Sequence, residues 1–263
     1  MQEARVSYLL DSPHADLLGH GIIVVGHQVE YLGPIGFSAE PLAVTMHIGD
    51  VSAARFTMAY EVSERGVPVV RARTALCLFD FEAGRPRRLG PAERAWFSAQ
   101  AEPLAPLRDV GDHRVGERAH SQPLLVRWSD IDRYGHVNNT VYYDYLGEAR
   151  VALYAELLPD AIRATMDADP AHTWLVARQD LVHLGQMTHR REPYAVRTAF
   201  GPLGRTSSTL AAEIVDPDSG RPLARALSVV VHGDAAGRPS PLPDALRAAG
   251  ERWPAVRHRT ATP

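Results

Sequence analysis

The chain has 263 residues, of which 45% are hydrophobic and 22% are charged, and its formal net charge at pH 7 is -3. This length suits one large domain or two small ones with a sizeable core, and the weakly negative charge gives no general attraction to nucleic acid or to an anionic membrane. All 28 basic residues are arginines, which excludes a Schiff-base lysine, pyridoxal phosphate attachment and a phosphate-loop lysine.

The cysteine content and the hydropathy pattern predict a cytoplasmic protein. Cys77 is the only cysteine, so no intramolecular disulfide can form, as expected in a reducing compartment. Neither a leader with a basic start nor a run of about 18 apolar residues is found, and we therefore expect no membrane span.

In chain order, the first half of the sequence is predicted to be a short helix followed by an antiparallel sheet. Phe56, Met58, Tyr60 and Val62 alternate with more polar neighbours, a pattern typical of a strand with one buried face. Clusters of Pro and Gly separate consecutive strand patterns by short turns, which favours antiparallel pairing. Residues 101–121 lack sustained periodicity and are predicted to be a linker.

The second half is predicted to begin with a strand in PLLVRW and a long helix from about Asn139 to Leu158. Apolar residues recur in this helix at three- and four-residue spacing, at Tyr142, Tyr145, Leu146, Ala149 and Leu153. Asn138 or Asn139 can cap the helix start, and Pro159 follows its end.

Further strands follow this helix, where Leu210, Ala212 and Ile214 alternate with Thr209, Ala211 and Glu213. The tail, residues 250–263, is rich in Arg and Pro and is expected to be loose, with Trp253 as a possible anchor.

The two halves are copies of one pattern. EYLGP at 30–34 and EPLAV at 40–44 match VHLGQ at 182–186 and EPYAV at 192–196, both at an offset of 152 residues. EARV at 3–6 repeats EARV at 148–151, so the first copy holds only the second half of the helix.

The counterpart of residues 124–147 would lie upstream of Met1, and we expect the first copy to lack its first strand and helix start. A truncation or a misplaced start site is our hypothesis for this difference. The predicted organisation is a first repeat at 1–100, the linker at 101–121, a second repeat at 122–249 and the tail at 250–263.

SDIDRYGHVNN, residues 129–139, stands between the predicted strand and helix of the second copy. A helix start presents unpaired backbone N–H groups and the positive end of the helix dipole, which can stabilise an oxyanion. Asp132, a few residues earlier, can attack a carbonyl carbon or take a proton from water, and His136 can orient or relay. This order of groups indicates acyl transfer.

VRWSDIDRYGHVNNTVYYDYLGEAR resembles the signature of the hotdog-fold acyl thioesterases, the superfamily of 4-hydroxybenzoyl-CoA thioesterase and the plant acyl-carrier-protein thioesterases. The resemblance implies an α+β fold of tandem hotdogs, each an antiparallel sheet wrapped around a long central helix. It also implies hydrolysis of an acyl-CoA or acyl-ACP thioester without a cofactor or metal, and a homo-oligomer of double-hotdog chains without nucleic acid or membrane partners.

Carried onto this sequence, the resemblance makes Asp132 the catalytic carboxylate and Asn139 the source of the N–H that polarises the thioester carbonyl. His136 matches the histidine that the plant enzymes use, but Tyr134 stands where those enzymes have an asparagine. This departure favours the simpler mechanism of a carboxylate and a helix dipole. The residues expected to contact the substrate are Tyr134, Gly135, Val137, Asn138 and Tyr142.

Other interpretations of these residues remain open. Asp130 and Asp132 can instead cap the loop, His136 can be a packed histidine, and the tyrosines can line a core. The pairs Arg87–Arg88 and Arg190–Arg191 can hold coenzyme A phosphates or form solvated faces. Alternative functions are a non-catalytic module that binds acyl thioesters or carrier protein, and a hotdog dehydratase.

Overall fold

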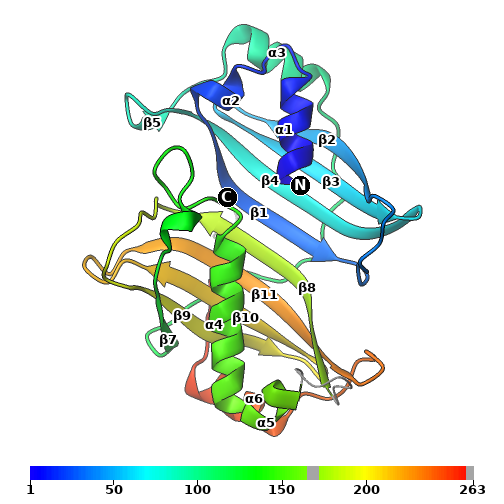
Figure 1. Ribbon diagram of the computed structural model, residues 1–263, viewed down its shortest axis with the longest axis vertical. Coiled ribbons are helices and arrows are strands. Elements are labelled where there is room, and N and C mark those ends of the chain that lie inside the picture. Colours follow the sequence, from blue (N-terminus) through cyan, green and yellow to red (C-terminus); the bar gives the residue numbers. More distant parts are fainter. Residues whose placement is uncertain (165–171, 259–263) are drawn as a thin grey trace. The chain divides into compact units, whose positions relative to one another are not determined.

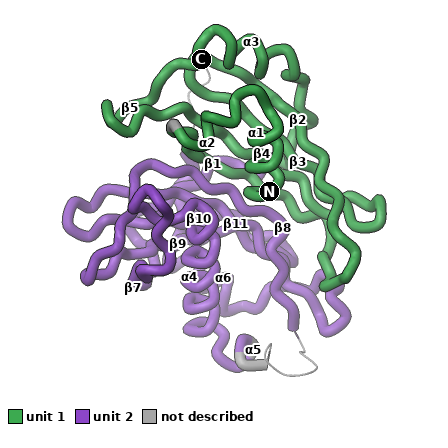
Figure 2. Tube along the Cα trace, turned by 45° about the horizontal axis from the view of Figure 1, so that its top comes forward, with its two compact units in different colours: residues 1–108 green, residues 109–263 purple. Residues whose placement is uncertain are grey.

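The computed structural model describes residues 1–164 and 172–258. The chain divides into two compact units, Met1–Arg108 (unit 1) and Asp109–Pro263 (unit 2) (Figure 2). Within the described residues, no helix is both long and apolar enough to cross a membrane. The same residues contain no group of three or more His, Cys, Asp or Glu side chains arranged to hold a metal ion.

Unit 1 is an antiparallel sheet with a short helix against one face (Figure 1). Its strands lie in the order β2-β3-β4-β1. Its elements are α1 (Gln2–Leu10), α2 (Leu17–His20), β1 (Ile22–Tyr31), β2 (Ala43–Val51), β3 (Arg55–Glu64), β4 (Val67–Asp80), β5 (Arg85–Pro86) and α3 (Pro91–Ala99).

The alternation predicted for β3 is confirmed. Phe56, Met58, Tyr60 and Val62 are all buried, whereas the residues between them are partly exposed. The buried face lies toward α1, where the Nη1 of Arg5 is 3.4 Å from the Tyr60 hydroxyl. Phe97 of α3 is also fully buried and stacks on Phe56, with the ring centres 4.0 Å apart. Burial of one sheet face against α1 and α3 therefore provides the core of unit 1.

Unit 2 is a five-stranded antiparallel sheet, in the order β8-β11-β10-β9-β7, wrapped around a long helix (Figure 1). Its elements are β6 (His113–Arg114), β7 (His120–Leu124), the 3-10 helix η1 (Trp128–Asp130), α4 (Tyr142–Leu157), α5 (Pro159–Ala164), β8 (His172–His183), β9 (Tyr194–Leu203), β10 (Ser207–Val215), β11 (Pro222–Asp234), α6 (Asp244–Arg252) and β12 (Val256–Arg257).

The buried face of α4 is the one that the sequence predicts. Its buried residues are Tyr142, Tyr145, Leu146, Ala149, Leu153 and Tyr154. The helix begins at Tyr142 rather than Asn139, because the side-chain oxygen of Asn138 accepts the N–H and hydroxyl of Thr140, both at 3.0 Å, and forms a turn instead. The strand expected in PLLVRW ends at Leu124.

The one-sided burial predicted for the strand at Leu210–Ile214 is wrong. Thr209, Ala211 and Glu213 are buried as well, because β6 packs on β10 and covers the second face of the sheet. β6 in turn pairs with β12, and Trp253 is buried. The residues expected to form a linker and a loose tail therefore contribute ordered strands and core to unit 2.

The strand registers of the two units match the sequence repeat. On β4, Arg71 pairs with Glu61 of β3 and with Glu30 of β1. On β11, its counterpart Arg225 pairs with Glu213 of β10 and with Val182 of β8. Unit 1 differs in having a nine-residue α1 where α4 has 16 residues, and four long strands where unit 2 has a fifth, β7. The chain is thus an α+β tandem of sheets that each pack on a helix.

Candidate active site

The sequence motif lies in unit 2, on the loop between η1 and α4. Ile131 and Val137 form an antiparallel bridge, inside which the Asp132 N–H donates to the His136 carbonyl at 2.8 Å. The Gly135 N–H donates to the Asp132 carbonyl at 3.0 Å, and Gly135 has a φ of 79° that a side chain would disfavour. These bonds make residues 132–136 a closed turn.

Asp130 has a structural role in this loop. Its carboxylate is buried and accepts hydrogen bonds from the Tyr145 hydroxyl at 2.6 Å and from the Arg127 N–H at 3.0 Å. Burial alone would raise the pKa of Asp130, but the bonds from Tyr145 and Arg127 outweigh it and hold this pKa below its usual range. The Asn138 N–H also donates to the Asp130 carbonyl, so Asp130 ties η1, the loop and α4 together.

Asp132 is half-buried, and one of its carboxylate oxygens is anchored within the turn. Its Oδ1 accepts the Tyr134 N–H at 2.8 Å and the His136 N–H at 3.4 Å. Its charge also reaches the Tyr142 hydroxyl at the start of α4. Burial raises the pKa of Tyr142 well above its usual range, and nearby Tyr194 and Asp132 add to that shift. One oxygen of the carboxylate is therefore fixed within the loop that leads into α4.

The other predicted catalytic residues lie on the same short loop. The backbone N–H and C=O of His136 both bond to Asp132, which fixes the position of this residue. Asn139 is partly buried in the turn at residues 138–141, three residues before α4 begins. Its N–H therefore lies in the turn that precedes the helix rather than in the first turn of α4.

The residues expected to contact substrate divide into two groups. Tyr134 and Gly135 are exposed, and the Arg133 guanidinium stacks 4.7 Å from the centre of the Tyr134 ring. Val137 and Tyr142 are buried in the core cluster around α4, and the Val137 N–H donates to the Met187 carbonyl at 2.9 Å. Asn138 is partly buried. One side of the loop is thus exposed to solvent, and the other packs against the core of unit 2.

Sequence reasoning did not identify His183 as a neighbour of this site. Its ring packs edge-on against Tyr142 with the ring centres 4.5 Å apart. Burial lowers the pKa of His183 to about 4, so its ring is neutral at pH 7. At the repeat offset of 152 residues, the counterpart of His183 in the first copy is Tyr31. This difference in residue type is the only sign in the sequence that His183 belongs near the site.

The arginine pairs considered for phosphate binding are engaged within their own units. Arg87 forms a two-pronged ion pair with Glu93, at 3.0 and 2.8 Å. Arg190 contacts Asp216 at 3.1 Å and Asp218 at 2.8 Å. Arg88 and Arg191 are exposed. The ion pairs of Arg87 and Arg190 thus stabilise the units in which these two residues lie.

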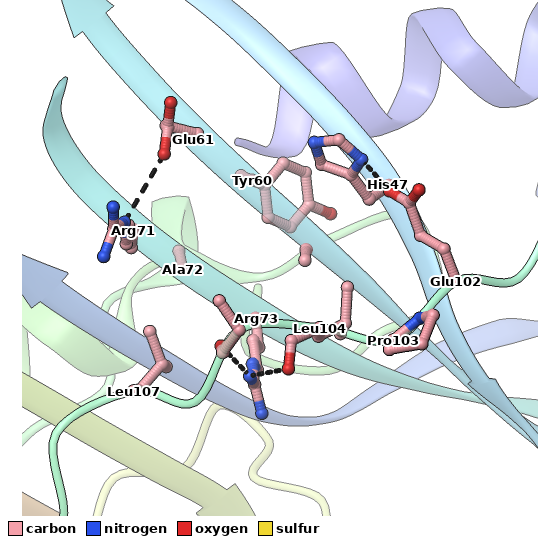
Figure 3. Close-up of a pocket in the computed structure, with 12 residues that line it drawn as sticks. His47, Tyr60, Glu61, Arg71, Ala72, Arg73, Glu102, Pro103, Leu104 and Leu107 are labelled. Carbon is pink, nitrogen blue, oxygen red and sulfur yellow. Dashed lines mark hydrogen bonds and ion pairs between the residues drawn. The ribbon is translucent and has the colours of Figure 1, made fainter. Parts of the chain in front are cut away.

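A separate hollow of about 230 Å³ lies within unit 1, between the outer face of the sheet and residues 102–107 (Figure 3). Arg71 lies 3.4 Å from Glu61, His47 contacts Glu102, and the Arg73 guanidinium donates to the carbonyls of residues 104 and 105. The contacts of His47 and Arg73 hold residues 102–105 against β2 and β4, and none of the lining residues belongs to the motif.

Comparison with known proteins finds a family to which part of the chain is similar. Residues 126–250 match the family model described as the Thioesterase-like superfamily. No curated protein matches the chain by sequence.

Three solved structures are similar over most of the chain. One, assigned as a candidate oleoyl thioesterase from Lactobacillus plantarum, has a TM-score of 0.65 and 13% identity, and covers 92% of this chain and 85% of its own. The 12:0-ACP thioesterase from Umbellularia californica has a TM-score of 0.58 and 16% identity, over 83% and 76%. An acyl-ACP thioesterase from Bacteroides thetaiotaomicron has a TM-score of 0.56 and 13% identity, over 82% and 79%.

At these identities the three likenesses establish the fold, which is a tandem of hotdogs. The match to the family model covers the unit that carries the motif, including Asp132, Asn139 and all of α4. Residues 126–250 of this chain are thus similar to the thioesterase-like superfamily.

Proposed function

We propose that this chain hydrolyses an acyl thioester to a free acid and a thiol, with Asp132 as the catalytic carboxylate. The observation that carries the proposal is the half-buried carboxylate of Asp132, which two backbone N–H groups fix within the loop that leads into α4. The match of residues 126–250 to the family model supports the reaction class, and the local geometry supports the assignment of roles.

In the proposed reaction, Asp132 removes a proton from a water molecule whose oxygen attacks the thioester carbonyl carbon. A backbone N–H of the turn at residues 138–141, that of Asn139, polarises the carbonyl and stabilises the oxyanion. The C–S bond then breaks, and the departing thiolate takes the proton that Asp132 removed. Because the N–H groups of Tyr134 and His136 both donate to Oδ1 of Asp132, we assign the proton transfer to Oδ2.

The remaining motif residues support this reaction indirectly. The two backbone bonds between His136 and Asp132 hold the carboxylate in position. Tyr134, Gly135 and Asn138 are proposed to contact the substrate from the solvent-exposed side of the loop. Val137 and Tyr142 are proposed to border the acyl group, from within the core cluster that they share.

The substrate is proposed to be an acyl-CoA or an acyl-ACP. Two of the similar structures are named as thioesterases of acyl-ACP, and the sequence signature is shared with enzymes that act on coenzyme A thioesters. The chain is proposed to act as a cytoplasmic enzyme without a cofactor.

A second candidate is a module that binds an acyl thioester without hydrolysing it. The observation in its favour is the close packing of Val137 and Tyr142, both of which are expected at the acyl-binding side of the loop. The two candidates differ in a single observable, the release of thiol.

Thiol release from a panel of acyl-CoA and acyl-ACP substrates of increasing chain length tests the proposal. We expect turnover with at least one member, detected with a chromogenic thiol reagent, and a product mass equal to that of the free acid. Because Cys77 is buried, the protein blank is expected to be low. Binding without thiol release supports the second candidate and contradicts the first, whereas loss of water from a 3-hydroxyacyl thioester indicates a dehydratase.

A further inference from the structure

The hollow on the outer face of the unit 1 sheet has a base that differs from the same part of unit 2. Ala59 of β3 lines this base, and it pairs with His47 of β2 on one side and with Arg73 of β4 on the other. The positions in the same register of unit 2 are Ala199, Ala211 and Leu227. Unit 1 therefore has a basic side chain on each side of a small residue, where unit 2 has apolar residues.

Unit 1 alone encloses the hollow. Every residue that lines it lies between positions 47 and 107, and residues 102–107 form the wall opposite the sheet (Figure 3). Leu104 of this wall lies so close to Gly49 that a side chain at position 49 would collide with it. The volume of about 230 Å³ equals that of about eight water molecules, so the hollow suits a ligand of fewer than about ten non-hydrogen atoms.

Arg73 contributes a positive charge to the hollow. Its Nη2 donates to the backbone carbonyls of Leu104 and Ala105, which are neutral acceptors. Among residues 1–164 and 172–258, no carboxylate forms an ion pair with Arg73. Because both bonds use Nη2, the N–H groups of Nε and Nη1 remain as donors for a bound anion.

The two carboxylates that line the hollow each contact another basic side chain. Glu61 lies 3.4 Å from the Nε of Arg71, and Glu102 contacts His47 (Figure 3). Arg71 stands on the same face of β4 as Arg73, two residues earlier and about 7 Å away. The charge that a ligand can neutralise is therefore that of Arg73, with Arg71 as a second guanidinium nearby.

The remaining walls of the hollow are mainly apolar. Leu104 and Leu107 line it on the side of residues 102–107, and Ala59 and Ala72 line it on the side of the sheet. An inorganic anion would leave these surfaces in contact with water, whereas a carboxylate on a short hydrocarbon chain would cover them. The hollow thus suits an anion with an apolar tail.

We propose that this hollow binds a short-chain carboxylate, with its carboxylate on the guanidinium of Arg73 and its tail against Leu104 and Leu107. None of the lining residues belongs to the motif that carries Asp132, so the site does not depend on the proposed hydrolysis. Binding is therefore expected to be the same in Asp132→Asn as in the wild-type chain.

Titration of the ¹⁵N-labelled full chain with hexanoate, followed by the amide shifts of residues 102–107, tests this proposal. We expect a dissociation constant on the order of 1 mM, as suits a ligand of about eight non-hydrogen atoms. Hexanol, which lacks the charge, and inorganic phosphate, which lacks the tail, are expected to bind at least about tenfold more weakly, the cost of losing either kind of contact.

Arg73→Leu, which introduces the residue of unit 2, is expected to raise the dissociation constant of hexanoate by about tenfold or more. Leu107→Asp is expected to do the same by placing a negative charge in the hollow, and it leaves the bonds of Arg73 to the carbonyls intact. Arg55→Leu, the same change at an exposed position of β3, is the matched control and is expected to leave binding unchanged.

Circular dichroism checks that each variant is folded. The proposal is overturned if hexanol or phosphate binds as tightly as hexanoate, or if Arg73→Leu and Leu107→Asp both bind hexanoate as the wild type does. Shifts confined to residues 129–142 also overturn it, because they place hexanoate at the motif instead of in the hollow.

Discussion

Replacing Asp132 with Asn is expected to lower kcat/KM for thioester hydrolysis by about 10²- to 10⁴-fold, the usual contribution of a general base. The asparagine retains a side-chain oxygen that can accept the Tyr134 N–H, which Asp132 accepts at 2.8 Å. The turn is therefore preserved, while the negative charge and the proton acceptor are lost. The measurement is initial-rate thiol release, with the thermal unfolding midpoint recorded for both proteins.

Two further variants separate the role of this carboxylate from general effects of charge and position. Asp144→Asn removes the same charge from an exposed position in the first turn of α4 and is expected to leave the rate unchanged. His136→Ala is expected to reduce the rate less than Asp132→Asn, because the backbone of His136 makes the bonds that hold Asp132. Undiminished turnover in Asp132→Asn rules out the assigned role.

Replacing Asp130 with Ala is expected to lower the free energy of unfolding by about 3 kcal/mol, because the buried Tyr145 hydroxyl loses its charged acceptor and the loop loses its link to α4. Urea denaturation monitored by tryptophan fluorescence measures this loss. Glu251→Ala, an exposed change on α6, is the control and is expected to fall within about 0.5 kcal/mol of wild type.

A double-mutant cycle of Asp130→Asn with Tyr145→Phe isolates the contribution of this hydrogen bond, and we expect a favourable coupling of about 1–2 kcal/mol. The folded-state pKa of Asp130 is lowered, so its stabilising contribution is complete above the unfolded pKa of about 3.9 and is lost as the pH falls through the folded value. The stability difference between wild type and Asp130→Asn is therefore expected to shrink in acid. Additive single-variant losses would contradict this account of Asp130.

The repeat and the hydrophobic spacing predicted two copies of an antiparallel sheet and the long helix of the second copy, whereas the tandem hotdog fold was implied by the resemblance of the motif. The spacing of Tyr142, Tyr145 and Leu153 identifies the buried face of α4, and the repeat anticipates the matched registers of Arg71 and Arg225, which lie 154 residues apart in the sequence. The pattern failed on β10, where the second face is covered by residues distant in sequence. Burial of that kind depends on tertiary contacts, which alternation along one strand does not encode.

The candidate site was predictable in location but not in detail. Two acids two residues apart look alike in sequence, and only the packing of Tyr145 against Asp130 makes one structural while Asp132 stays half-buried. The helix start was placed at Asn139 because asparagine is a common cap, but the side chain of Asn138 forms a turn instead. His183 lies at the end of β8, far from the motif in sequence. No local sequence pattern could therefore connect it with the site.

A crystal structure of the chain with a non-hydrolysable acyl-CoA analogue, in which a ketone replaces the thioester, tests the central claim most directly. The account predicts the ketone oxygen within about 3 Å of the Asn139 N–H, and a carboxylate oxygen of Asp132 within reach of the carbonyl carbon or of a water beside it. An analogue bound with its carbonyl remote from this turn, and with the Asp132 side chain turned away from it, would contradict the account.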